Sequence, residues 1–227
     1  MKNKFFLFCF FCIMGFSQNY KGIKVHYKAL LESIPIDPKN GSHNVLFEEI
    51  NASLTNKSFL LQVNSKGFLF EEEIVMQQEN EKKHTATITN IIFAINTYFY
   101  DKDRDKFFSV SNNLNVLSTA DYKWEVTDES KKIDAYTSYK ATCVYSFVSS
   151  KGKTVNRLIT AWFTPEISFN YGPNGYMGLP GLILELEYDK TKLVAKEIQF
   201  FKEDIKIDFP KNKEVTEEEY LRKISIK

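Results

Sequence analysis

The sequence predicts a mainly β (α+β) fold: a single antiparallel, curved β-sheet domain with a short helix near its C-terminal end. Three observations carry this prediction. Short runs of alternating apolar and polar residues recur along the chain, polar turns separate them, and only one segment near the end has convincing helical spacing. A period of two is typical of half-buried strands, and short turns join strands into antiparallel sheets.

The alternating runs define the expected strands. After Gly22, the apolar residues Ile23, Val25, Tyr27 and Ala29 alternate with basic and histidine side chains, which predicts the first strand. Two hairpins are expected next, over 59–70 with a turn at 64–67 and over 98–110 with a turn at 101–106. Further strands are expected over 124–127, 139–148, 157–163, 182–188 and 193–201.

The C-terminal helix is predicted from its first residues. Thr216 and Glu219 form a capping box, in which each side chain satisfies a free backbone amide at the helix start. Apolar residues at 220, 221 and 224 continue at helical spacing. A second helix over residues 43–51 is left open.

The N-terminus has the pattern of a secretory signal peptide. Lys2 and Lys4 precede an apolar run over 5–16, and small residues at Gly15 and Ser17 suit a signal peptidase. We therefore expect residues 1–17 to be removed and 18–227 to form one domain. The run is shorter than the about 20 residues of a membrane-spanning helix, so no transmembrane segment is expected after cleavage. The product is expected in the periplasm, at the outer membrane or outside the cell.

Composition argues against two classes of protein. The formal net charge is +1 at pH 7 and no basic tract is present, so nucleic acid is not expected as a partner. Cys143 is the single cysteine outside the predicted signal peptide, which excludes an internal disulfide framework. It is expected to be a small buried hydrophobic residue.

Candidate metal and catalytic motifs are incomplete. Asp101, Asp103 and Asp105 alternate as in a calcium loop, but Lys106 stands where glycine is needed, so a polar hairpin tip is favoured. The histidines at 26, 43 and 84 lack the paired spacing of a metal site, and no metal or cofactor is expected. No nucleophile motif is recognisable, so whether the protein is an enzyme stays open.

Glu185 and Glu187 lie two residues apart in the strand expected over 182–188. They therefore share one face of that strand. Two carboxylates on one face suit acid/base chemistry, but a solvated outer face of the sheet is the favoured explanation.

The segment from Gly172 to Gly181 holds four of the nine glycines and two of the six prolines. Glycine permits positive φ and proline fixes φ, so we expect a rigid, shaped loop that leads into a core strand. The residues that would shape it are Gly172, Pro173, Gly175, Gly178, Pro180 and Gly181. The alternative is a ligand or partner loop, because three apolar residues fall in a segment expected to be exposed. These candidate binding residues are Tyr176, Met177 and Leu179.

The same segment resembles the signature of the GLPGLI family, secreted proteins of Gram-negative bacteria whose biochemical role is unassigned. Upstream, a block similar to the family's W-F-T-P-E-I comprises Trp162, Phe163, Thr164, Pro165, Glu166 and Ile167, and Lys140 and Ala141 resemble its K-A step. Ser138 stands where the family usually has cysteine. The resemblance implies an exported protein and names no activity.

Three functions remain open. The first is a secreted or periplasmic, non-enzymatic binding or interaction module, with the glycine-rich loop as its contact surface for a cell-envelope protein. The second is a carrier of lipid or another hydrophobic ligand, because a curved antiparallel sheet rich in aromatic residues can enclose an apolar molecule. The third is a secreted hydrolase with an unrecognised site.

Overall fold

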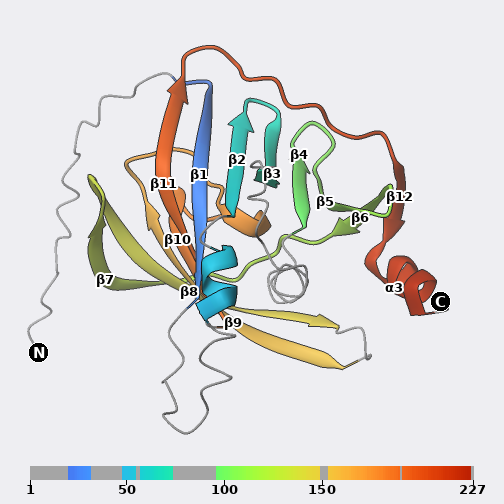
Figure 1. Ribbon diagram of the computed structural model, residues 1–227. Helices are drawn as coiled ribbons and strands as arrows, with labels where there is room; N and C mark the ends of the chain where they lie inside the picture. The colour runs from blue at the N-terminus through green and yellow to red at the C-terminus, as the bar shows by residue number, and fades with distance from the viewer. Residues whose placement is uncertain are drawn as a thin grey trace, which may run out of the picture.

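One curved sheet organises the part of the chain that the computed structural model describes, which is residues 20–31, 48–54, 57–73, 96–148, 153–189 and 191–225 (Figure 1). Its twelve strands are β1 (Gly22–Leu31), β2 (Ser58–Asn64), β3 (Gly67–Glu73), β4 (Thr97–Asp101), β5 (Lys106–Ser111), β6 (Leu114–Ser118), β7 (Glu125–Ile133), β8 (Tyr136–Val148), β9 (Thr154–Thr164), β10 (Leu182–Tyr188), β11 (Thr191–Phe201) and β12 (Lys213–Thr216).

The strand order across the sheet is β12-β6-β5-β4-β3-β2-β1-β11-β10-β9-β8-β7. Neighbours are antiparallel except β12 and β6, which are parallel. The prediction of a mainly β, largely antiparallel sheet with a short C-terminal helix is confirmed. β6 and β12 were not predicted, because each is short and mixes polar with apolar residues.

The helix α3 (Glu217–Ser225) begins at the predicted capping box. The Glu219 amide donates to the Thr216 hydroxyl over 3.2 Å, and the Thr216 amide donates to the Glu219 carboxylate over 3.0 Å. Residues 48–54 are also helical, and they overlap the helix left open over 43–51. Residues 43–47 and the predicted signal peptide lie outside the described residues.

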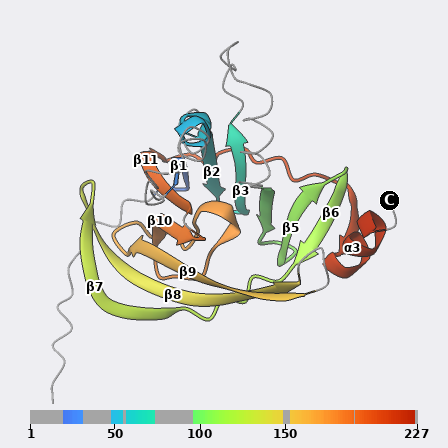
Figure 2. The ribbon, with the colours of Figure 1, turned by 60° about the horizontal axis from the view of Figure 1, so that its bottom comes forward.

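The sheet curves around the glycine-rich loop, whose single turn η1 (Pro173–Gly175) contacts β2, β3 and β4 (Figure 2). Alternate residues of the central strands face this loop and form the core. Val25 and Tyr27 of β1, Leu61 of β2 and Phe68 of β3 are completely buried there. We call this concave side the inner face and the opposite side the outer face.

The connection between β11 and β12 covers part of the outer face. Ile207 and Phe209 in this connection pack against Leu69, Phe99 and Phe108 of β3, β4 and β5. In the described ranges, no helix is long and apolar enough to cross a membrane.

Candidate functional site

Backbone hydrogen bonds fix the shape of the glycine-rich loop. The Tyr176 amide donates to the Pro173 carbonyl over 3.2 Å, and the Gly178 amide donates to the Asn170 carbonyl over 3.0 Å. The Ile183 amide donates to the Tyr171 carbonyl over 3.0 Å. The loop is therefore bonded along its length to the residues on either side of it.

Two positions in the loop require glycine because the backbone approaches a neighbour closely. A Cβ on Gly172 would lie 2.6 Å from the Ile183 side chain. A Cβ on Gly181 would lie 2.0 Å from the Thr164 carbonyl oxygen, and the φ of Gly181 is +153°. Both contacts place the loop directly against β9 and β10. A side chain at either glycine would push the loop away from these strands.

The expected exposure of the three candidate binding residues is wrong. Tyr176 is 4% exposed, Met177 is 9% exposed and Leu179 is 1% exposed. The loop turns inward, under the curve of the sheet, so its apolar side chains join the core. Gly178 and Pro180 form its exposed part.

Tyr176 lies at the centre of a group of aromatic side chains on the inner face. Its ring centroid is 4.8 Å from that of Tyr122, 6.2 Å from Trp124, 6.3 Å from Tyr145 and 6.4 Å from Tyr188. Further rings from β4, β5 and β8 and the guanidinium of Arg157 from β9 adjoin these five rings. We call the whole group the inner aromatic cluster, which comprises Tyr98, Phe107, Tyr122, Trp124, Tyr145, Phe147, Arg157, Tyr176 and Tyr188.

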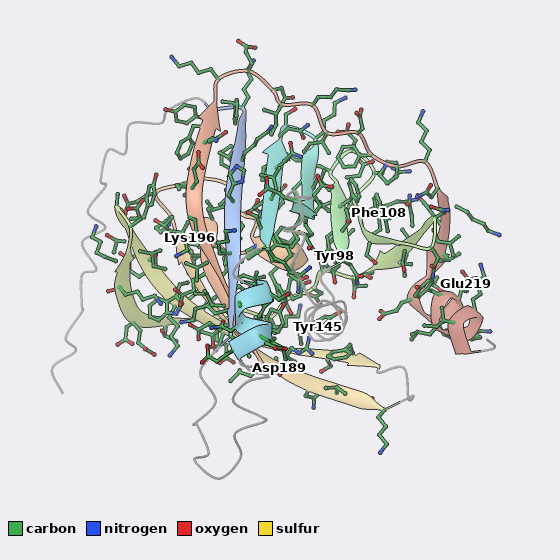
Figure 3. All side chains as sticks on the ribbon, in the orientation of Figure 1. Tyr98, Phe108, Tyr145, Asp189, Lys196 and Glu219 are labelled. Atoms are coloured by element: carbon green, nitrogen blue, oxygen red, sulfur yellow. The ribbon has the colours of Figure 1, made fainter. Side chains whose placement is uncertain are left out.

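Most members of the inner aromatic cluster are only half-buried, whereas Tyr176 and Phe107 are buried. In Figure 3, Tyr98 of β4, Tyr145 of β8 and Asp189 after β10 come to the same region of the molecule. The cluster therefore keeps accessible ring surface around a buried centre.

Polar groups are placed among these rings. The Trp124 indole Nε1 donates to the Met177 carbonyl over 2.9 Å, and the Asn174 side-chain amide donates to the Tyr188 hydroxyl over 3.1 Å. Asn174 has a left-handed φ of 55°. Its Oδ1 is buried and has no hydrogen-bond partner among the described residues. A hydrogen-bond acceptor without a partner among the described residues is thus enclosed next to the rings.

The tyrosine hydroxyls of the cluster stay protonated at neutral pH. Burial raises the pKa of Tyr98, Tyr122, Tyr145 and Tyr176, and the neighbouring Tyr145 raises that of Tyr122 further. Protonated hydroxyls both donate and accept hydrogen bonds, so they can orient a polar ligand group.

Arg157 of β9 supplies a positive charge at the cluster. The carbon of its guanidinium lies 4.9 Å from the centroid of the Phe147 ring and 5.2 Å from that of Tyr188. Its Nε forms an ion pair with the carboxylate of Asp189. The charge is therefore stacked between two rings and partly compensated.

Residues of the upstream motifs gather on the outer face instead. Lys131 of β7 lies with its Nζ 4.1 Å from the centroid of the Trp162 ring and 2.6 Å from a Glu185 oxygen. Lys140 is the register partner of Trp162, and its Nζ lies 2.7 Å from a Glu129 oxygen. The fold thus brings the motif residues Lys140 and Trp162 together with Glu185 across β8, β9 and β10.

The expectation that Glu185 belongs to a solvated face is wrong. Glu185 is 6% exposed, and its carboxylate lies 2.6 Å from Lys131 and 3.2 Å from Lys192. Burial alone would raise the pKa of Glu185, but the hydrogen bond from Lys131 and the charges of Lys131 and Lys192 together lower it. Glu187 is half-buried and pairs with Lys192 over 2.7 Å. Both carboxylates are thus engaged by lysine.

The remaining motif residues lie in the core or in the turn after β9. Ala141, Phe163, Thr164 and Ile167 are buried, and Pro165 and Glu166 form the exposed turn after β9. Ser138 is completely buried, and its Oγ has no hydrogen-bond partner within the part of the chain described.

Other candidates from the sequence are placed as follows. Cys143 is buried, as predicted, and burial raises the pKa of its thiol to about 11. Asp101 lies in the predicted hairpin tip and pairs with Arg104 over 2.7 Å. His26 lies 3.0 Å from Glu73 on the outer face, while His43 and His84 lie outside the described residues. Where the structure is described, no group of three or more histidine, cysteine, aspartate or glutamate residues could hold a metal ion.

Most of the inner aromatic cluster was missed by sequence reasoning. Tyr98 of β4 is far in sequence from the cross-strand pair Tyr145 and Arg157 of β8 and β9, and each fits an ordinary alternating pattern. The one local signal was Tyr188, which ends the strand that the loop leads into. Only the curvature of the sheet brings these side chains together.

Comparison with solved structures supports the fold. Two structures of PNGF-II, in the C2 and P21 space groups, are similar to this chain, with TM-scores of 0.51 and 0.53 and sequence identities of 15% and 17%. The matches cover 90% and 91% of this chain but 32% and 33% of those chains. This chain therefore spans about a third of the length of the structures it matches, and the likeness shows the fold alone.

The sequence has no match among curated proteins. One family model matches residues 148–185, the stretch from the end of β8 through the glycine-rich loop to Glu185. The matched residues therefore include the whole glycine-rich loop. The family is described as "Protein of unknown function (Porph_ging)".

Proposed function

We propose that this protein is a non-catalytic binding module whose working surface is the inner aromatic cluster. The observation that carries the proposal is the gathering of half-buried rings from β4, β8, β10 and the segment before β7 around Tyr176. Aromatic surface with a few placed polar groups is typical of small-molecule sites. The glycine-rich loop then acts as the floor of the site and not as its outward contact.

The chemistry of the cluster favours an amphipathic ligand with a flat apolar part. The half-buried rings offer apolar contact, and Arg157 offers a positive charge. A carrier of lipid or another hydrophobic molecule would use the same rings. A carrier differs from the proposed binding module because it keeps its ligand during purification. Mass spectrometry of an organic extract of the protein would detect that ligand.

A secreted hydrolase has less support. Glu185 is held ionised between two lysines, so it is a poor general acid. The thiol of Cys143 is buried and protonated at neutral pH, so it is a poor nucleophile. The N-terminal pattern supports export, which the mass of the protein isolated from cells tests, because cleavage after Ser17 leaves Gln18 as the first residue.

Titration with the dye 8-anilinonaphthalene-1-sulfonate tests the binding surface, because the dye combines aromatic rings with one negative charge. We expect saturable binding of one dye molecule per chain. Tyr145→Ala should weaken it at least fivefold, whereas Val144→Ser should not, since these neighbours in β8 face opposite sides of the sheet. Thermal unfolding of both variants checks that they fold. Absence of saturable binding, or equal binding by Tyr145→Ala, would refute the proposal.

A further inference from the structure

The hairpin of β8 and β9 projects beyond the rest of the sheet (Figure 1). The pairing of β7 with β8 ends where Glu125 lies opposite Thr142, and the pairing of β10 with β9 ends where Glu187 lies opposite Thr160. Beyond these threonines, the described residues of the two strands pair only with one another. We call residues 142–148 and 154–160 the ribbon.

The outer face of the ribbon combines apolar exposure with a lack of charge. Its cross-strand pairs are Thr142 with Thr160, Val144 with Leu158, and Ser146 with Asn156. Val144 is 63% exposed and Leu158 is 62% exposed, more than any other large hydrophobic residue in the described ranges. The opposite face of the ribbon is anchored in the core by Cys143 and Ile159. The two exposed side chains therefore sit side by side on a supported surface.

The edge strand β7 is highly charged, whereas the outer face of the ribbon is not. Five of its nine residues are charged, namely Glu125, Asp128, Glu129, Lys131 and Lys132, and its register shifts between Val126 and Ser130. Charges and bulges keep an exposed edge from pairing with other chains. The cross-strand pairs on the outer face of the ribbon carry no charge, and exposed apolar surface of this kind marks an interaction site.

We infer that two copies of this chain associate through the outer faces of their ribbons, as a weak symmetric dimer. A two-fold contact needs a surface that complements itself, and an uncharged face with a central apolar pair and polar neighbours meets that need. The formal net charge is +1 for the full sequence and −1 without Lys2 and Lys4 of the predicted signal peptide, and either value gives little repulsion between copies.

The size of the ribbon sets the strength of this dimer. Two strands of seven residues cover about 23 Å by about 10 Å. This is smaller than the roughly 800 Å² that each partner buries in a standard stable interface. The dimer should therefore form only at high protein concentration.

Sedimentation equilibrium of the protein as purified from cells, at concentrations from about 10 µM to 1 mM, tests the inference. We expect the average mass to rise toward that of a dimer. Leu158→Asp should weaken association at least tenfold, because it places two charges in the contact. Leu30→Asp, at an exposed position on β1, is the matched control and should associate like the unmodified protein.

Two results would overturn the dimer. One is a monomeric mass at every concentration, which would leave the ribbon face to a different protein. The other is unchanged association of Leu158→Asp, with a melting temperature showing that this variant is folded.

Discussion

The Tyr27 hydroxyl donates a hydrogen bond of 2.6 Å to the backbone carbonyl of Ile183, 156 residues away in sequence. Ile183 lies at the start of β10, where the register of β10 against β9 shifts between Ile183 and Glu185. Tyr27 is completely buried, and burial raises the pKa of its hydroxyl, so the group remains a donor. This bond ties β1 to the strand that the glycine-rich loop leads into.

Tyr27→Phe should lower the free energy of unfolding by about 1–3 kcal/mol, because the buried Ile183 carbonyl loses its side-chain donor. Urea unfolding followed by circular dichroism measures the change. Tyr139→Phe is the control, since Tyr139 is exposed and its hydroxyl can reach water, and it should cost less than about 0.5 kcal/mol. Equal stability of the two variants would mean that the bond to Ile183 contributes little.

Two glycines of the loop should respond differently to alanine. At Gly181 the new Cβ would lie 2.0 Å from the Thr164 carbonyl, so Gly181→Ala should destabilise the fold by more than about 3 kcal/mol. At Gly178 the Cβ would have open space, and only the φ of +93° is unfavourable, so Gly178→Ala should cost about 1–2 kcal/mol. Thermal unfolding of both variants compares them. A larger loss at Gly178 would contradict this account of the loop.

A strand can be predicted from the sequence when only one of its faces is buried, because apolar residues then alternate with polar ones and mark the buried face. β1 shows this clearly, with Val25 and Tyr27 buried and Lys24 and His26 less so. β6 could not be found in this way. Its Asn115 is buried because the side-chain amide donates to the Pro210 carbonyl over 2.9 Å, and no local pattern indicates that distant partner.

The candidate site depends on curvature, which the sequence pattern does not specify. Tyr176 looks like an exposed loop residue in sequence, because loops usually run over the surface. The sheet bends far enough to enclose this loop, so the same side chain becomes the centre of a cluster (Figure 2). Glu185 was misplaced for a related reason: lysines from β7 and β11 reach it, and their positions depend on the strand order.

Glu185→Gln should destabilise the fold by about 1–3 kcal/mol at pH 7, because Lys131 and Lys192 lose a largely buried carboxylate. Glu129→Gln is the matched control. Its carboxylate also pairs with a lysine but is 54% exposed, so the loss should stay below about 1 kcal/mol. Chemical denaturation of both variants measures these losses.

The effect of Glu185 should also depend on pH in a defined direction. The folded pKa of its carboxyl is lowered, so its stabilisation is present above the unfolded pKa of about 4.3 and is lost as pH falls through the folded value. The difference between the unmodified protein and Glu185→Gln should therefore shrink in acid. A constant difference down to pH 3 would show that charge is not its cause.

Ser138→Ala should leave the stability unchanged or raise it by up to about 1 kcal/mol, because it removes a buried hydroxyl without a partner among the described residues. Ser138→Cys should behave alike and form no disulfide with Cys143, because residues five apart on a strand face opposite sides. Thermal unfolding and a thiol count test both variants. A loss above about 1 kcal/mol for Ser138→Ala would mean that the hydroxyl is hydrogen-bonded, for example to water.

Cys143 should make the fold sensitive to alkali. The folded pKa of its thiol, about 11, lies above the unfolded value, so its contribution is complete below about pH 8.5 and is lost as pH rises toward 11. Buried tyrosines add to alkaline unfolding, but they are present equally in Cys143→Ala. Urea unfolding from pH 8 to 11 should therefore show a shallower decline for this variant, and parallel declines would mean that the thiol does not titrate with the fold.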